Sequence, residues 1–193
     1  MESICVFCGS NPGNKPYYIE QAKTLGALMA QQNTTLIYGG ASIGIMGAIA
    51  DSVMNEGGQV IGVIPTFLSK KEVRHDGLTQ LIEVESMHQR KRKMAALARG
   101  FIAMPGGFGT IEELFEILTW AQLGLVKHPI ALLNIDGYFN ALLAMMDHMV
   151  SHDFLRPENR EMLLIDSDPK KLLELMAAFK PVTVPKWLGQ EET

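Results

Sequence analysis

The stretch GFIAMPGGFGTIEELFE, residues 100–116, joins a short apolar run to a glycine-rich loop and then to a segment with helical spacing. An apolar run that ends in glycine and proline is typical of a strand buried on both faces. A loop such as PGGFGT, followed by acidic residues, is typical of the start of a helix. The stretch therefore predicts a strand, a loop and a helix, which together are the repeating unit of an α/β fold.

The same order recurs along the chain. Near-continuous apolar strands that alternate with helices predict a parallel sheet with right-handed crossovers. We therefore expect a single-domain, Rossmann-like, doubly wound α/β fold with helices on both faces, a nucleotide-binding catalytic domain over residues 1–180 and a C-terminal tail over 181–193. The other apolar runs that end in glycine or proline are SICVFCGS (3–10), TTLIYGG (34–40), QVIGVIPT (59–66) and HPIALLNIDG (128–137).

The composition excludes several kinds of partner. The chain of 193 residues has 17 basic and 21 acidic residues, a formal net charge of −4. This balance gives no reason to expect affinity for nucleic acid or anionic lipid. The longest uncharged run, residues 33–50, is interrupted by glycines and is too polar to cross a bilayer. The N-terminus lacks the regions of a signal peptide, so we expect a cytoplasmic location.

Three glycine loops are expected at one edge of the sheet, where ligands of doubly wound folds bind. They are CGSNPG, YGGASIGIMG and MPGGFGT. Neither the GxGxxG fingerprint nor a Walker A loop is present, and no carboxylate ends the second strand, which argues against NAD chemistry and ATP hydrolysis. Backbone amides at a helix N-terminus remain, and they suit one phosphate group bound without a metal. The alternative is that the glycines only mark turns.

The acidic residues after the third loop allow two interpretations. Thr110 and Glu113 have the spacing of a capping box, and Glu112 is explained by the helix dipole alone. However, a capping Glu113 would compete with phosphate for the same amides. Helical periodicity places Glu113 on the side opposite Ile111, away from the core. There it could act on the sugar of a bound nucleoside monophosphate by orienting water or stabilising positive charge.

The segment SMHQRKRKMAALAR, residues 86–99, predicts a helix that begins with a Ser86–Gln89 capping pattern. Arg90 and Lys91 fall on its apolar stripe, while the next two basic residues lie opposite. Because an unpaired buried charge is costly, the two cations require an anion such as a nucleotide phosphate or Glu113. The alternatives are a solvated face or a nuclear-import patch.

Metal or redox chemistry has little support. Cys5 and Cys8 have the spacing of a zinc or redox pair, but residues three apart in a strand point to opposite faces, and no second pair completes a zinc site. The five histidines show no ligand spacing. We therefore expect two buried free cysteines and neither a zinc site nor a redox pair at these positions.

The motifs PGGFGTIEE and SMHQRK together make the chain similar to a known protein family. The chain resembles the LONELY GUY family, the cytokinin riboside 5′-monophosphate phosphoribohydrolases formerly described as lysine decarboxylases, whose signature is PGGxGTxxE. The likeness continues through CVFCGS, YGGASIGIMG, TWAQLG and ALLNIDGYFN, and so covers nearly the whole chain. The residues that match the signature are Pro105, Gly106, Gly107, Gly109, Thr110 and Glu113.

The resemblance implies hydrolysis of the N-glycosidic bond of a nucleoside 5′-monophosphate, such as AMP or an N6-modified AMP, to free base and ribose 5-phosphate. It implies no metal or organic cofactor, and it implies that Arg90 and Glu113 are the catalytic pair. Glu72 matches a binding position only loosely, because the RHDGLTQ that follows departs from the family pattern. The residues expected to bind substrate are Glu72, Lys91, Gly106, Gly107, Phe108, Gly109, Thr110, Ile111, Glu112 and Thr119, with Ser10, Gly40 and Met87 from the neighbouring loops and the basic helix.

The family also implies a homodimer with the active site near the subunit interface, which would cover apolar residues such as Ile117 and Trp120. Two rival functions stay open. A protein of the same fold could carry a nucleotide or a molybdenum cofactor without catalysis. A lysine decarboxylase would need pyridoxal phosphate and a Schiff-base lysine, and no lysine here has a recognisable setting for one.

Overall fold

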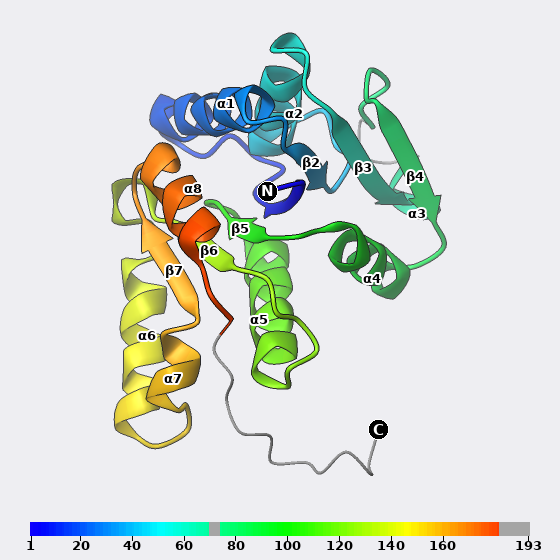
Figure 1. Cartoon of the computed structure of the whole chain (residues 1–193). Coiled ribbons are helices and arrows are strands. Elements are labelled where there is room, and N and C mark those ends of the chain that lie inside the picture. Colours follow the sequence, from blue (N-terminus) through cyan, green and yellow to red (C-terminus); the bar gives the residue numbers. More distant parts are fainter. Residues whose placement is uncertain (70–73, 182–193) are drawn as a thin grey trace.

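The structure is a computed structural model that describes residues 1–69 and 74–181. These residues form one seven-stranded, all-parallel sheet with the strand order β4-β3-β2-β1-β5-β6-β7 (Figure 1). The predicted doubly wound α/β fold is confirmed. The strands are β1 (Ser3–Phe7), β2 (Thr35–Tyr38), β3 (Val60–Pro65), β4 (Gln80–Val84), β5 (Phe101–Ala103), β6 (Ile130–Leu133) and β7 (Leu163–Asp166).

Helices cover both faces of the sheet. Helices α1, α2 and α8 pack on one face, and α4, α5 and α6 pack on the other (Figure 1). The long helices are α1 (Pro16–Gln31), α2 (Gly44–Asn55), α4 (Met87–Leu97), α5 (Phe108–Gln122), α6 (Asn140–Ser151) and α8 (Pro169–Ala178). The short ones are α3 (Thr66–Ser69), the 3-10 helix η1 (Ile135–Gly137) and α7 (Pro157–Arg160).

The core consists of two layers, because alternate residues of each strand face opposite sides of the sheet. In β1, Ile4 and Val6 pack against α1, α2 and α8, whereas Cys5 and Phe7 pack on the other side. Cys8 belongs to the first layer, so the two thiols lie on opposite faces, as predicted, and both are free and buried. Each fully buried aliphatic side chain of these layers contributes about 1.5–3 kcal/mol to folding.

The five apolar runs correspond to β1, β2, β3, β5 and β6, whereas the edge strands β4 and β7 were not predicted. Both edge strands are only partly buried, and their sequences, QLIEV and LLID, lack the long apolar run of a central strand. Residues 182–193 of the predicted tail lie outside the described part of the chain, so the division at residue 180 stays a prediction. No helix within residues 1–69 and 74–181 has the length and apolar character needed to span a bilayer.

The strand order reverses between β1 and β5, which are neighbours at the centre of the sheet. The loops that follow these two strands leave the same edge and are bonded together, because the Gly9 amide donates to the Pro105 carbonyl at 3.0 Å. A Cβ on Gly9 would lie 3.3 Å from Cα of Gly106, so the contact leaves little room for a side chain. Ligands of open α/β sheets bind at such a reversal.

Candidate active site

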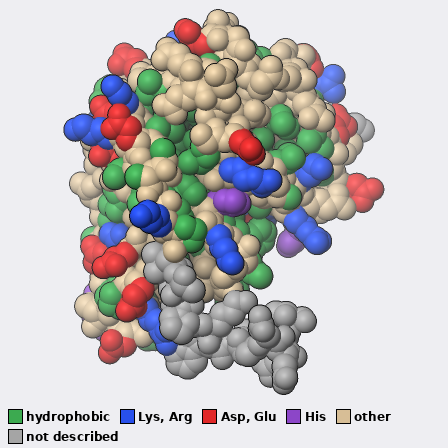
Figure 2. Space-filling model, in the orientation of Figure 1, with side chains coloured by type: hydrophobic (Ala, Val, Ile, Leu, Met, Phe, Trp, Pro, Cys, Tyr) green, Lys and Arg blue, Asp and Glu red, His purple; other side chains and the backbone are tan. Residues whose placement is uncertain are grey.

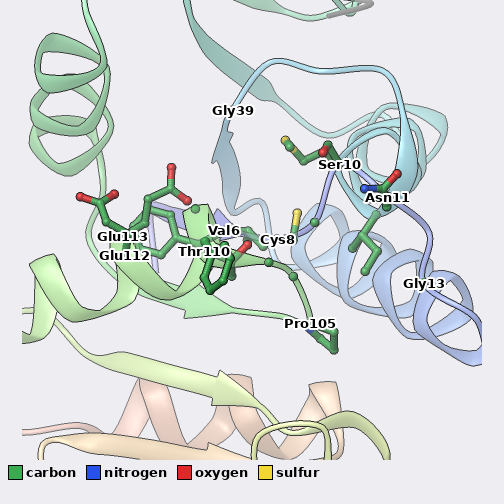
Figure 3. Close-up of a pocket in the computed structure, with 18 of the residues that line it drawn as sticks. Val6, Cys8, Ser10, Asn11, Gly13, Gly39, Pro105, Thr110, Glu112 and Glu113 are labelled. Carbon is green, nitrogen blue, oxygen red and sulfur yellow. The ribbon is translucent and has the colours of Figure 1, made fainter. Parts of the chain in front are cut away.

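A cavity of about 510 Å³ opens at this reversal, between the loop after β1 and the start of α5. Figure 3 shows Ser10 and Asn11 of the first loop on one side of it and Thr110 with two glutamates of α5 on the other. The volume is within the range of small-molecule sites. The predicted site residues that line the cavity are Ser10, Met87, Arg90, Gly106, Gly107, Phe108, Gly109, Thr110, Glu112 and Glu113.

Other predicted residues lie outside this lining. The Gly40 carbonyl accepts from the His75 amide at 3.0 Å, and the Thr119 hydroxyl donates within α5 to the Phe115 carbonyl at 2.7 Å. Ile111 is half-buried against the core, because it lies on the inner side of α5. Lys91 is engaged in ion pairs, and Glu72 falls outside the described residues.

The N-terminus of α5 faces the cavity without a side-chain cap. The helix begins at Phe108 with Gly107 as its N-cap residue, so Thr110 lies inside the first turn and the capping-box interpretation of Thr110 and Glu113 was wrong. Thr110 is buried instead, and its hydroxyl oxygen would lie only 2.1 Å from a Cβ on Gly106. A helix start of this kind presents unsatisfied amides and a positive dipole to an anion.

The loop around these amides is open to the cavity. A Cβ on Gly107 or Gly109 would meet no atom within 4 Å, and the Phe108 side chain is 96% exposed. The glycines thus keep side chains away from the backbone over the first turn of α5. The arrangement is suited to close approach of a phosphate group to the backbone.

Arg90 lies on α4, which begins as predicted, with the Ser86 hydroxyl accepting from the Gln89 amide at 3.2 Å. The Arg90 side chain is buried, with 7% of the residue exposed. Its Nε donates to the Val63 carbonyl and its Nη2 to the Gly39 carbonyl, each at 3.0 Å. Among the described residues, no carboxylate lies within ion-pair distance of Arg90. Its partners are the Val63 carbonyl of β3, the Gly39 carbonyl just after β2 and the Met87 sulfur at 3.9 Å.

Glu113 lies one helical turn into α5 and is half-buried in the cavity wall. Its burial raises the pKa of the carboxyl group to about 7, against the opposing effect of the Arg90 charge. The carboxylates of Glu112 and Glu116 raise this pKa further, and Lys91 lowers it. A carboxyl group that titrates near neutral pH can accept or donate a proton under physiological conditions.

The anionic partners of Lys91 are residues of α5 and not a group in the cavity. Its Nζ lies 2.5 Å from Glu112 Oε1 and 3.0 Å from Glu116 Oε1. The prediction that Lys91 requires an anionic partner is therefore met by two carboxylates of the protein. The helix dipole alone therefore does not account for Glu112, because its carboxylate also pairs with Lys91.

A tyrosine that lines the cavity was missed. The Tyr138 hydroxyl donates to the Gly106 carbonyl at 2.6 Å, and its ring packs edge-on against Tyr18 and Phe139. The segment DGYFN after β6 could have signalled it, because β6 ends at the same sheet edge. Lining residues that were not individually predicted to bind substrate or to take part in catalysis are Val6, Phe7, Cys8, Gly9, Asn11, Gly13, Tyr18, Gly39, Ile45, Met46, Met94, Pro105 and Tyr138.

The site offers no thiol nucleophile and no metal cluster in the described part of the chain. Burial raises the pKa of the Cys8 thiol well above its usual range, so the group is neutral at physiological pH. Residues 1–69 and 74–181 contain no group of three or more His, Cys, Asp or Glu side chains that could hold a metal ion. The groups that this site offers for catalysis are the backbone amides at the start of α5, the buried cation of Arg90 and the carboxyl group of Glu113, whose pKa is raised.

Solved structures share the fold at low sequence identity. A molybdenum cofactor binding protein from Rippkaea orientalis superposes with a TM-score of 0.69 at 22% identity, covering 92% of this chain and 96% of that one. A Moco carrier protein from Chlamydomonas reinhardtii gives a TM-score of 0.67 at 20% identity, covering 92% and 99%. Identities this low establish similarity of fold only.

Sequence relatives are much closer. A probable cytokinin riboside 5′-monophosphate phosphoribohydrolase of Oryza sativa subsp. japonica, LOGL6, is 45% identical over 98% of this chain and 77% of its own. Two cytokinin riboside 5′-monophosphate phosphoribohydrolases of Arabidopsis thaliana, LOG7 and LOG1, are 43% and 44% identical over 92% of this chain and 82% and 84% of theirs. The family model described as "possible lysine decarboxylase" matches residues 46–176. The chain belongs to the LONELY GUY family, to which the older decarboxylase description was attached.

Proposed function

We propose that the protein hydrolyses the N-glycosidic bond of an N6-modified adenosine 5′-monophosphate, giving a free base of the cytokinin class and ribose 5-phosphate. The names of relatives at 43–45% identity support this reaction. The observation that carries it in this chain is the uncapped N-terminus of α5, which opens on the cavity one turn before Glu113. The distance between the phosphate and the sugar of a nucleoside monophosphate is comparable to the rise of one helical turn.

In the proposed reaction, the amides at the start of α5 hold the 5′-phosphate and thereby place the ribose beside Glu113. Water adds to the anomeric carbon, the bond from that carbon to the base nitrogen breaks, and the departing base takes up a proton. Ionised Glu113 accepts the proton of the water or stabilises the positive charge that develops on the sugar.

Arg90 is proposed as a fixed positive charge in the wall of the site. A guanidinium supplies a positive charge and a fixed set of hydrogen-bond donors, so its role is to position the ribose, the phosphate or Glu113. The two carbonyl bonds hold the guanidinium in one place before substrate arrives. Such preorganised charge needs no rearrangement during the reaction.

The experiment uses purified protein with N6-isopentenyl-AMP, AMP and the two corresponding ribosides, each in EDTA, and follows free base by chromatography. Base release from a monophosphate, with much slower release from its riboside, is the expected result. Equal turnover of monophosphate and riboside would contradict phosphate anchoring. AMP binding without any base release would instead favour the carrier role, which so far has support from the fold alone.

We further propose that the protein works as a homodimer in the cytoplasm. Large apolar side chains stay exposed at both ends of α5, namely Phe108, Leu123 and Leu125. Hydrophobic side chains are visible at several places across one face of the molecule (Figure 2). Ile117 does not contribute, because it is buried within the chain, so that part of the sequence prediction was wrong. Light scattering of the purified protein would test the dimer, and a monomer mass would contradict it.

A further inference from the structure

We propose that Lys91, Glu112 and Glu116 form a clamp that ties α4 to α5 and so sets the distance between Arg90 and Glu113. The inference rests on the proposed function and adds positioning residues to it. It also gives Lys91 a role different from the substrate contact that family resemblance implies.

The clamp is a three-membered ion pair with little access to water at its centre. The Lys91 side chain is 12% exposed, and its Nζ meets Glu112 at 2.5 Å and Glu116 at 3.0 Å. The Glu116 side chain is 27% exposed and Glu112 is the outermost member at 55%. An ion pair shielded in this way is screened by salt less than a surface pair is.

The placement of the three residues makes the clamp a spacer between helices. Lys91 directly follows Arg90 on α4, while Glu112 directly precedes Glu113 on α5. Glu112 and Glu116 are four residues apart and so lie on the same side of α5. Because each helix is rigid, bonding Lys91 to both glutamates fixes Arg90 relative to Glu113.

Apolar side chains of α4 and α5 pack in the same core layer, but in the described part of the chain no other ion pair links the two helices. The guanidinium of Arg90 is bonded to β2 and β3, so it holds α4 to the sheet but not to α5. Within the described part of the chain, the ion pairs that join α4 to α5 are both made by Lys91. Lys91 itself does not line the cavity, and carboxylates already occupy two of the three donors of its ammonium group.

The clamp also sets the charge around Glu113. Lys91 lowers the pKa of the Glu113 carboxyl group, whereas Glu112 and Glu116 raise it. Loss of Lys91 should therefore move the acid limb of the pH profile to higher pH, and loss of Glu116 should move it to lower pH. A residue with a merely structural role would not shift the profile in these opposite directions.

The test is a double-mutant cycle with Lys91→Met, Glu116→Gln and both together, measured as kcat and KM for N6-isopentenyl-AMP across pH. We expect each single variant to lower kcat about tenfold with KM changed less than twofold, and the double variant to be no worse than the poorer single one. Lys93→Met, a change of an exposed cation on the same helix, is the matched control. A raised KM with unchanged kcat in Lys91→Met, together with a silent Glu116→Gln, would make Lys91 a substrate contact and overturn the clamp.

A charge swap keeps the proposal testable if the single variants fold poorly. Lys91→Glu combined with Glu116→Lys should recover most of the kcat lost by Lys91→Glu alone, because the pair can re-form with reversed polarity. A lysine needed by the substrate could not be replaced in this way. Absence of recovery in a folded double variant counts against the clamp.

A distance measurement separates this inference from the proposed reaction. Spin labels on Lys93→Cys of α4 and Gln122→Cys of α5, in protein diluted with unlabelled chains, report the spacing of the two helices without any substrate. The distance distribution should broaden when Glu112→Gln and Glu116→Gln are added. An unchanged distribution would refute the clamp even in an active enzyme, whereas a broadened one would support it even if no base were released.

Discussion

The guanidinium of Arg90 lies directly against the backbone of Gly39. Its Nη2 donates to the Gly39 carbonyl at 3.0 Å, and a Cβ on Gly39 would lie only 2.1 Å from the same nitrogen. A side chain at position 39 and Arg90 in its observed place therefore exclude each other. Gly39 has no positive φ, so the absence of a side chain matters here for space and not for backbone conformation.

Gly39→Ala should displace Arg90 while leaving the fold intact. A shift of about 1 Å in a positioning group can cost about 100-fold in rate, so we expect kcat/KM to fall by about that factor. Gly77→Ala is the matched control, because a Cβ there makes only ordinary contacts with His75. Steady-state kinetics measures the loss of kcat/KM, and the melting temperature shows whether the fold is intact. Full activity in Gly39→Ala would show that the position of Arg90 is not critical.

Tyr138→Phe should weaken the recognition of phosphate specifically. The hydroxyl bonds to the carbonyl of Gly106, whose peptide group continues into the amide of Gly107. Loss of one such hydrogen bond costs about 0.5–1.5 kcal/mol, which corresponds to a rise of about 2- to 10-fold in the Kd for AMP. Calorimetry with AMP and adenosine measures the difference, and Tyr17→Phe on α1 serves as the control. Equal weakening of both ligands would indicate general damage to the site.

The activity should depend on ionised Glu113. Because burial raises the pKa of this carboxyl group to about 7, kcat/KM should increase with pH through about 7 and level off above it. A profile that stays flat between pH 5 and pH 8, in the wild type with chemistry rate-limiting, is incompatible with a carboxylate that must lose its proton in the free enzyme.

The stability should show the opposite dependence on pH. The pKa of Glu113 is higher in the folded chain than in the unfolded one, so the folded state binds more protons between about pH 4.5 and pH 7. Stability is therefore lost as pH rises through this window, by at most about 3 kcal/mol. Glu113→Gln removes this loss, and its melting temperature should exceed that of the wild type at pH 8 more than at pH 5. An equal difference at both pH values would contradict the raised pKa.

The central part of the fold could be read from the sequence because buried parallel strands are continuous apolar runs. SICVF and IALL are examples, and both became central strands. The edge strands β4 and β7 could not be read, because an edge strand is partly exposed and carries a mixed sequence such as QLIEV. Periodicity along one segment does not distinguish such a strand from a loop.

The site was predictable where its residues belong to local motifs and not where it depends on contacts across the fold. The spacing of the residues from Gly106 to Glu113 predicted the start of a helix. The exact start at Phe108 was missed, because the N-cap residue Gly107 has no side chain to mark it. Arg90 donates to the carbonyls of Val63 and Gly39, which are distant in the sequence, and no side-chain pattern encodes such backbone partners. The ion pairs of Lys91 could not be predicted either, because Glu112 and Glu116 belong to another helix.

The most direct measurement is the stoichiometry of products from N6-isopentenyl-AMP, with wild-type protein and Glu113→Gln compared in EDTA. We predict free base and ribose 5-phosphate in equal amounts from the wild type, and a rate about 10²- to 10⁴-fold lower in a normally folded Glu113→Gln. Full turnover by folded Glu113→Gln, or no base release by the folded wild type from any nucleoside monophosphate, would contradict the account.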